Sequence, residues 1–118
     1  MAGFPAFTDN HVRQQIVEGL LRRGWKVVRS VDAFGEAADD NILFDYAVKE
    51  GLVFVTCDEK IHTIAHARLE AGETFRMVFW PQEHHARMSD GDFIRALEEL
   101  SRRPDAFSYS IEYIKPKR

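Results

Sequence analysis

Short apolar runs alternate with longer amphipathic stretches along this chain of 118 residues. The runs are rich in β-favouring side chains, which is typical of strands, and they span residues 4–8, 25–28, 52–56 and 75–80. The run at 52–56 is almost uninterrupted, and this favours a central strand buried on both faces of a parallel sheet. A last β-prone segment at 107–114 alternates Tyr109, Ile111 and Tyr113.

Between the runs, apolar residues recur three and four positions apart and predict helices. These helices span residues 11–23, 41–50, 60–71 and 89–102. Glycine follows the first three and suits a left-handed position at a helix end, at Gly24, Gly51 and Gly72. Asn10 is expected to cap the first helix, and Ser89 with Asp92 the last. Residues 32–38 are expected to form an irregular link.

Strands that alternate with helices indicate a parallel sheet covered on both faces. We therefore predict one α/β domain over residues 1–118, with three layers in the order α/β/α and a mainly parallel sheet of four to five strands. The chain contains no internal repeat, low-complexity tract or linker that would divide it.

The composition of the chain limits where this domain is located and which kinds of site and partner it has. No stretch approaches the roughly 20 apolar residues of a membrane span, and the first residues lack the pattern of a secretory signal, so we expect a cytoplasmic protein without a membrane partner. Cys57 is the only cysteine, which excludes an internal disulfide and zinc sites built from several thiolates. The net charge of −3 argues against a protein that coats nucleic acid through bulk positive charge.

Two of the apolar runs end at an aspartate, at Asp9 and at Asp58. If these runs are neighbouring parallel strands, both carboxylates lie at the carboxyl edge of the sheet, where open α/β folds bind ligands. Carboxylates held together repel one another unless a cation lies between them. Mg²⁺ or Mn²⁺, which favour oxygen ligands, are the expected occupants.

A third carboxylate is available where the predicted helix at 41–50 begins. Asp39 or Asp40 reaches the same sheet edge if the preceding loop passes over it, whereas the plainer interpretation is that one of the pair only caps the helix.

The segments that carry these residues resemble the short bacterial PIN-like family, which is grouped with toxin components and related to the PIN-domain ribonucleases. The resemblance covers nearly the whole chain and depends on the order and spacing of its segments, which are residues 7–10, 20–28, 40–47, 50–58 and 77–82 and the helix after Ser89.

The resemblance implies a PIN-like fold with an acidic pocket for Mg²⁺ or Mn²⁺ and cleavage of single-stranded RNA. By position it gives catalytic and metal-binding roles to Asp9, Asp40 and Asp58, with Asp39 as the other metal-binding candidate. It also implies a toxin role, a separate antitoxin partner and a homodimer.

One departure from the family pattern bears on activity. Two residues beyond the last site aspartate the family has a further aspartate followed by phenylalanine, where this chain has Lys60 and Ile61. Lys60, expected at the pocket rim, replaces the charge of a second metal, binds a phosphate of the substrate, or marks a domain that no longer cleaves. The sequence leaves these alternatives open.

Further residues near the predicted edge suit supporting roles. The hydroxyl of Thr56 is placed to orient a site carboxylate, and Asn10 is a second supporting candidate. Arg13 lies one helical turn beyond Asp9 and either holds the scissile phosphate or is a solvated arginine.

Other residues have plainer interpretations. His62 and His66 are four apart on a predicted helix, a spacing that can bind zinc, but the glutamate of a metalloprotease helix is absent between them, and we interpret them as ordinary surface histidines. Cys57 is expected to be a buried, unreactive thiol. Trp80 is expected in the core, the alternative being an exposed ring that stacks on a base.

The predicted acidic pocket and the PIN-like resemblance together suggest two functions of different classes. The first is a metal-dependent endoribonuclease for single-stranded RNA, as the toxin of a toxin–antitoxin pair. The second is a catalytically inactive PIN-like module that binds RNA or protein.

Overall fold

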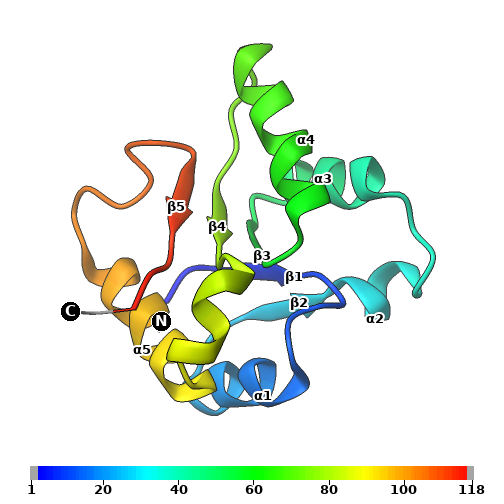
Figure 1. Ribbon diagram of the computed structural model, residues 1–118. Coiled ribbons are helices and arrows are strands. Elements are labelled where there is room, and N and C mark those ends of the chain that lie inside the picture. The colour runs from blue at the N-terminus through cyan, green and yellow to red at the C-terminus, as the bar shows by residue number, and fades with distance from the viewer. Residues whose placement is uncertain (1–2, 117–118) are drawn as a thin grey trace.

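The apolar runs of the chain become the strands of one parallel sheet in the computed structural model, which describes residues 3–116 (Figure 1). The five strands are β1 (Ala6–Thr8), β2 (Val27–Arg29), β3 (Val53–Thr56), β4 (Met77–Phe79) and β5 (Ile111–Tyr113). They lie in the order β2-β1-β3-β4-β5, and every neighbouring pair is parallel. The predicted α/β class and parallel sheet are confirmed.

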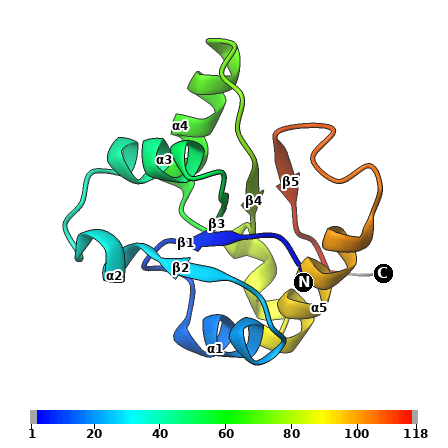
Figure 2. The same ribbon diagram turned by 180° about the vertical axis from the view of Figure 1, so that it is seen from behind.

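Helices cover both faces of this sheet and make it the middle of three layers (Figures 1 and 2). One face carries α1 (Gln14–Arg22) and α5 (Asp90–Arg102), and the other carries α3 (Asp40–Lys49) and α4 (Glu59–Glu70). The short helix α2 (Ser30–Phe34) follows β2, and the 3-10 helix η1 (Gln82–Arg87) precedes α5. Among residues 3–116, no helix has both the length and the apolar composition needed to cross a bilayer.

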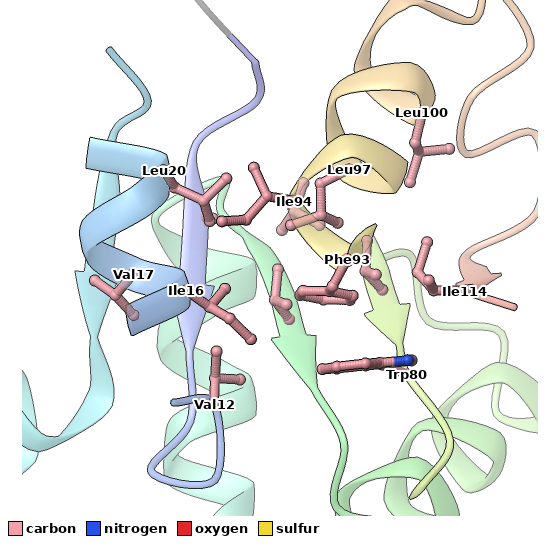
Figure 3. Packing of buried hydrophobic residues seen from close by; sticks show 14 of the residues in the cluster. Val12, Ile16, Val17, Leu20, Trp80, Phe93, Ile94, Leu97, Leu100 and Ile114 are labelled. Atoms are coloured by element: carbon pink, nitrogen blue, oxygen red, sulfur yellow. The ribbon is translucent and has the colours of Figure 1, made fainter. Parts of the chain in front are cut away.

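The face under α1 and α5 is packed with aliphatic side chains and one aromatic stack (Figure 3). Trp80 lies against Phe93 with ring centroids 4.3 Å apart and nearly parallel planes. Gly19 lets the two helices approach, because a Cβ atom there would come within 2.5 Å of Ile94 Cδ1. The burial of Trp80, which is 3% exposed, makes it a core residue as expected and excludes the base-stacking alternative.

The face under α3 and α4 is built mainly from aromatic rings. Phe7 and Phe54 are paired across β1 and β3, and their ring centroids are 5.4 Å apart. Phe44 on α3 packs edge-on against Phe75 at 4.8 Å. These rings belong to one buried apolar cluster between the sheet and the two helices.

The region between β1 and α1 differs from the sequence prediction. Helix α1 begins at Gln14 rather than at residue 11, because the chain first makes a turn in which the Val12 N–H donates to the Asp9 carbonyl at 3.2 Å. Asn10 was wrongly predicted to cap this helix: its Oδ1 accepts a hydrogen bond of 3.0 Å from Ser30 Oγ.

Two short helices and one strand also differ from prediction. Helix α2 occupies part of the expected irregular link, and η1 lies in the segment between the fourth predicted strand and the last predicted helix, for which no element was expected. One or two turns are too short to show a periodic pattern. The final strand covers only Ile111–Tyr113, and Tyr109 is 83% exposed. The predicted caps are confirmed at Asp39, which accepts from the Asn41 N–H, and at Ser89 with Asp92, which form a reciprocal capping box.

Candidate metal centre

The carboxyl ends of β1 and β3 meet at the point where the strand order reverses. From β1 the chain continues to β2 on one side, while β3 lies on the other side, with the intervening helices on opposite faces. A crevice opens at such a switch point, and open α/β sheets bind their ligands there. Asp9 follows β1 directly and Asp58 lies two residues beyond β3, so both emerge into this crevice.

Three potential ligand groups come together in the crevice. Asp9, His11 and Asp58 each contribute one ligand atom, and these atoms lie within 4.8 Å of one another. His11 Nε2 is 3.4 Å from Asp58 Oδ2. This group could hold a metal ion, since carboxylate oxygen and imidazole nitrogen are both common ligands of divalent cations.

Asp9 is the buried member of this group, with 5% of its surface exposed. Its Oδ2 accepts a hydrogen bond of 2.8 Å from the Thr56 hydroxyl, whereas its Oδ1 is buried without a hydrogen-bond partner. Burial raises the pKa of this carboxyl to about 6. A buried, unpaired carboxylate oxygen is costly, and a cation bound to it would relieve that cost.

Thr56 holds both aspartates in place with a single hydroxyl. While it donates to Asp9, the same oxygen accepts a hydrogen bond of 3.0 Å from the Asp58 N–H. The side chain is 1% exposed, so water does not compete for these bonds. The structure therefore gives Thr56 the orienting geometry that the sequence suggested.

The two carboxylate oxygens of Asp58 have different roles, one in capping a helix and one in the candidate metal site. Its Oδ1 accepts a hydrogen bond of 2.8 Å from the Lys60 N–H and caps α4, and its Oδ2 faces His11. The positive end of the α4 macrodipole lies beside this carboxylate and offsets part of the repulsion from Asp9.

A hollow of about 100 Å³ surrounds these groups. We name it the acidic hollow; its walls are formed by Asp9, Asn10, His11, Gly35, Glu36, Ala38, Asp40, Leu43, Asp58 and Ile61. The loop before α3 thus passes over the sheet edge, and it brings Asp40 to the hollow. Burial, then the neighbouring charges of Asp58 and Asp39, raise the pKa of Asp40. Asp39 caps α3 and is exposed, and it is not part of the wall.

The two basic side chains expected near the site, Lys60 and Arg13, lie in different places. Lys60 is exposed at the start of α4, close enough for its charge to oppose the rise in the pKa of Asp40. Arg13 lies just before α1, and its guanidinium pairs with Asp90 at the start of α5, with Nε donating to Oδ1 at 2.9 Å. Arg13 is therefore held toward α5 and does not line the hollow.

His11 and Glu36 are the site residues that the sequence reasoning missed. His11 lies two positions beyond Asp9, and this spacing was the only signal for it. Glu36 belongs to a loop whose path only the tertiary structure reveals. Cys57 lies between the site residues but is buried, and burial raises the pKa of its thiol to about 12, consistent with an unreactive thiol.

Comparison of the chain with protein-family models, with curated proteins and with solved structures finds no match. The PIN-like resemblance thus stays a prediction from the residues.

Proposed function

We propose that the acidic hollow binds Mn²⁺ or Mg²⁺ and that the protein is a metal-dependent endoribonuclease for single-stranded RNA. The observation that carries this proposal is the buried Asp9 Oδ1, which has no hydrogen-bond partner and belongs to a carboxylate close to Asp58 and His11. Buried polar atoms of folded proteins are rarely left unsatisfied, and an ordered water or a bound ion commonly completes them. The close approach of Asp58 and His11 favours an ion here.

The ligands in the hollow favour particular ions. Asp9 and Asp58, with Asp40 also lining the hollow, supply the oxygens that hard divalent cations prefer. His11 adds an imidazole nitrogen, which suits Mn²⁺ better than Mg²⁺. We therefore expect Mn²⁺ to bind more tightly than Mg²⁺.

When bound, such an ion lowers the pKa of a coordinated water and stabilises negative charge on a phosphodiester. Two surrounding residues suit the binding of the ion and of the RNA. His11 is exposed at the rim, where its imidazole would complete the ligands of the ion. Lys60 is exposed beside Asp40 and is available to bind a phosphate of the RNA. The toxin role, the antitoxin partner and the homodimer belong to this proposal through the family resemblance alone.

Metal binding is tested by thermal unfolding. With an assumed Kd near 1 mM, about 10 mM Mg²⁺ stabilises the native state by roughly 1.4 kcal/mol, or about 4 to 6 °C in Tm. Asp58→Asn should keep the helix cap, because asparagine is also a good N-cap, and should lose most of this shift. Asp32→Asn removes an exposed acid on α2 and serves as the matched control. A shift no larger than that of an equal ionic strength of NaCl would refute the metal site.

Catalysis is tested on a labelled single-stranded RNA with Mn²⁺. We expect Asp9→Asn and Asp58→Asn to reduce cleavage by roughly 100-fold or more, as for loss of groups that stabilise the transition state, and Asp32→Asn to retain full activity. Metal binding without cleavage would instead favour the inactive RNA-binding or protein-interaction module.

The role of Lys60 is tested separately by calorimetry. Lys60→Asp restores the acid of the family pattern, and an increase in Mn²⁺ affinity would show that the lysine replaces a ligand. Unchanged or weaker binding would leave Lys60 as a phosphate-binding or structural residue.

A further inference from the structure

A second group of potential metal ligands lies between α4 and the edge strand β5. His62 and His66 are one turn apart on α4, and Tyr113 ends β5, the edge strand that pairs with β4. We call these three residues the histidine–tyrosine cluster. None of the three lines the acidic hollow.

The three polar atoms of the cluster converge. His62 Nε2 is 2.8 Å from the Tyr113 hydroxyl oxygen and 3.1 Å from His66 Nε2. The Tyr113 oxygen is 3.4 Å from His66 Nε2, so the three atoms form a small triangle. The side chains come from residues up to 51 positions apart, and the fold alone brings them together.

This triangle has the dimensions of one face of a metal coordination sphere. Two ligands about 2.05 Å from one ion lie roughly 2.9 Å apart at a right angle and roughly 3.3 Å apart at a tetrahedral angle. We propose that His62, His66 and Tyr113 bind a single Zn²⁺ ion, with water completing its coordination. Imidazole nitrogen suits Zn²⁺, whereas Mg²⁺ prefers an all-oxygen site, so this site differs in ion preference from the acidic hollow.

The surroundings hold His62 in a ligating orientation. Its ring stacks on Phe79 with centroids 4.2 Å apart and planes 1° from parallel, a contact that favours this orientation of the imidazole. Its other nitrogen, Nδ1, faces Glu59 Oε2 at 3.5 Å. Histidines that bind metals commonly direct the second ring nitrogen at a carboxylate, which fixes the tautomer with the lone pair on Nε2.

The cluster is open enough for an ion to enter. The His62 side chain is 17% exposed, His66 is exposed, and Tyr113 is 42% exposed. A bound ion would join α4 to β5, because its ligands come from both elements. Zinc would therefore tie the edge strand to the helix layer above it.

Zinc calorimetry in a His11→Gln/Asp58→Asn background tests the site, because these two changes remove two of the three close-set ligand groups of the acidic hollow and leave only Asp9. The result is thereby independent of the proposed function. We expect one saturable Zn²⁺ site in this background and a rise in Tm on adding Zn²⁺. His66→Gln and Tyr113→Phe should each weaken binding, the former by at least roughly tenfold.

Matched controls come from the same chain. His84→Gln alters a histidine on η1, and Tyr109→Phe alters a tyrosine that is 83% exposed; both should bind Zn²⁺ as the background protein does. Absence of saturable binding in the background protein would overturn the proposal. Retention of full affinity in either His66→Gln or Tyr113→Phe would also overturn the three-residue site.

Discussion

The acidic hollow and the histidine–tyrosine cluster both border α4, but their polar atoms are satisfied in different ways. In the hollow, Asp9 Oδ1 is buried without a partner, and carboxylates face one another. In the cluster, each polar atom has a hydrogen-bond partner within the cluster itself. A cation bound in the hollow would therefore reduce the repulsion between its carboxylates. The polar atoms of the cluster are satisfied without an ion, and a bound ion would add a link between α4 and β5.

Burial nevertheless acts on both regions in the same direction, toward the neutral form of the ionisable group. It raises the pKa of Asp9 to about 6, and together with the nearby His66 it lowers the pKa of His62. Because one group is an acid and the other a base, the same physical cause gives opposite dependences of stability on pH.

The largest expected effect is the removal of the Asp9 charge. At pH 8 the ionised, metal-free Asp9 opposes folding, and a rise of about two pKa units corresponds to at most roughly 3 kcal/mol. Asp9→Asn should therefore stabilise the metal-free protein by about 1 to 3 kcal/mol, or roughly 4 to 12 °C in Tm. Thermal unfolding in EDTA measures this, with Asp32→Asn as the control; a lower Tm for Asp9→Asn would contradict it.

The raised pKa of Asp9 should also change how the stability of the metal-free protein depends on pH. Between about pH 4 and 6 the folded state holds the Asp9 proton more tightly than the unfolded chain, so stability should fall as pH rises through this window and level off above it. The fall should be smaller in Asp9→Asn, where Asp40, whose pKa is also raised, still contributes. Urea unfolding at several pH values measures both profiles.

Loss of the shared hydroxyl should have the next largest effect. Thr56→Val removes the donor to Asp9 and the acceptor of the Asp58 N–H, and unsatisfied buried groups of this kind cost about 1 to 3 kcal/mol. The Mn²⁺-induced rise in Tm should also shrink, because the carboxylates lose their orientation. Thr56→Ser keeps the hydroxyl and should retain that rise; its loss in Thr56→Ser would show that the hydroxyl is not what orients the site.

A smaller effect of opposite sign is expected from His62. Because its pKa is lowered in the folded state, the unfolded chain binds the proton first, and stability should drop as pH falls below about 6.5. His62→Gln in the Asp9→Asn background should make this drop shallower. Tm values at pH 5 and pH 7.5 measure it, and an unchanged difference between the two would show that His62 does not contribute.

The smallest effect is expected at Arg13, whose ion pair with Asp90 is partly exposed. Arg13→Gln and Asp90→Asn break the same pair and should each cost less than about 1 kcal/mol of stability. In the RNA cleavage assay, a higher KM for Arg13→Gln but not for Asp90→Asn would show that the guanidinium contacts substrate. Equal KM values would restrict Arg13 to its structural role.

Local sequence determined most of the secondary structure and part of the site. The apolar runs became strands, and the caps at Asp39 and Ser89 formed as expected, because these features depend on neighbouring residues. The positions of Asp9 and Asp58 at two strand ends were also readable, since each aspartate directly ends an apolar run of the sequence.

The strand order and the contacts across it were decided only by the tertiary structure. The sequence did not show that β1 and β3 flank a switch point, that Asn10 pairs with Ser30, or that α2 forms at all. The metal ligands predicted from the sequence were incomplete for the same reason. The contact of His11 with Asp58 and the contact of His62 with Tyr113 are formed only in the folded protein. Such contacts join residues some 50 positions apart, and the free energy that forms them comes from burying the sheet between two helix layers, which no local pattern encodes.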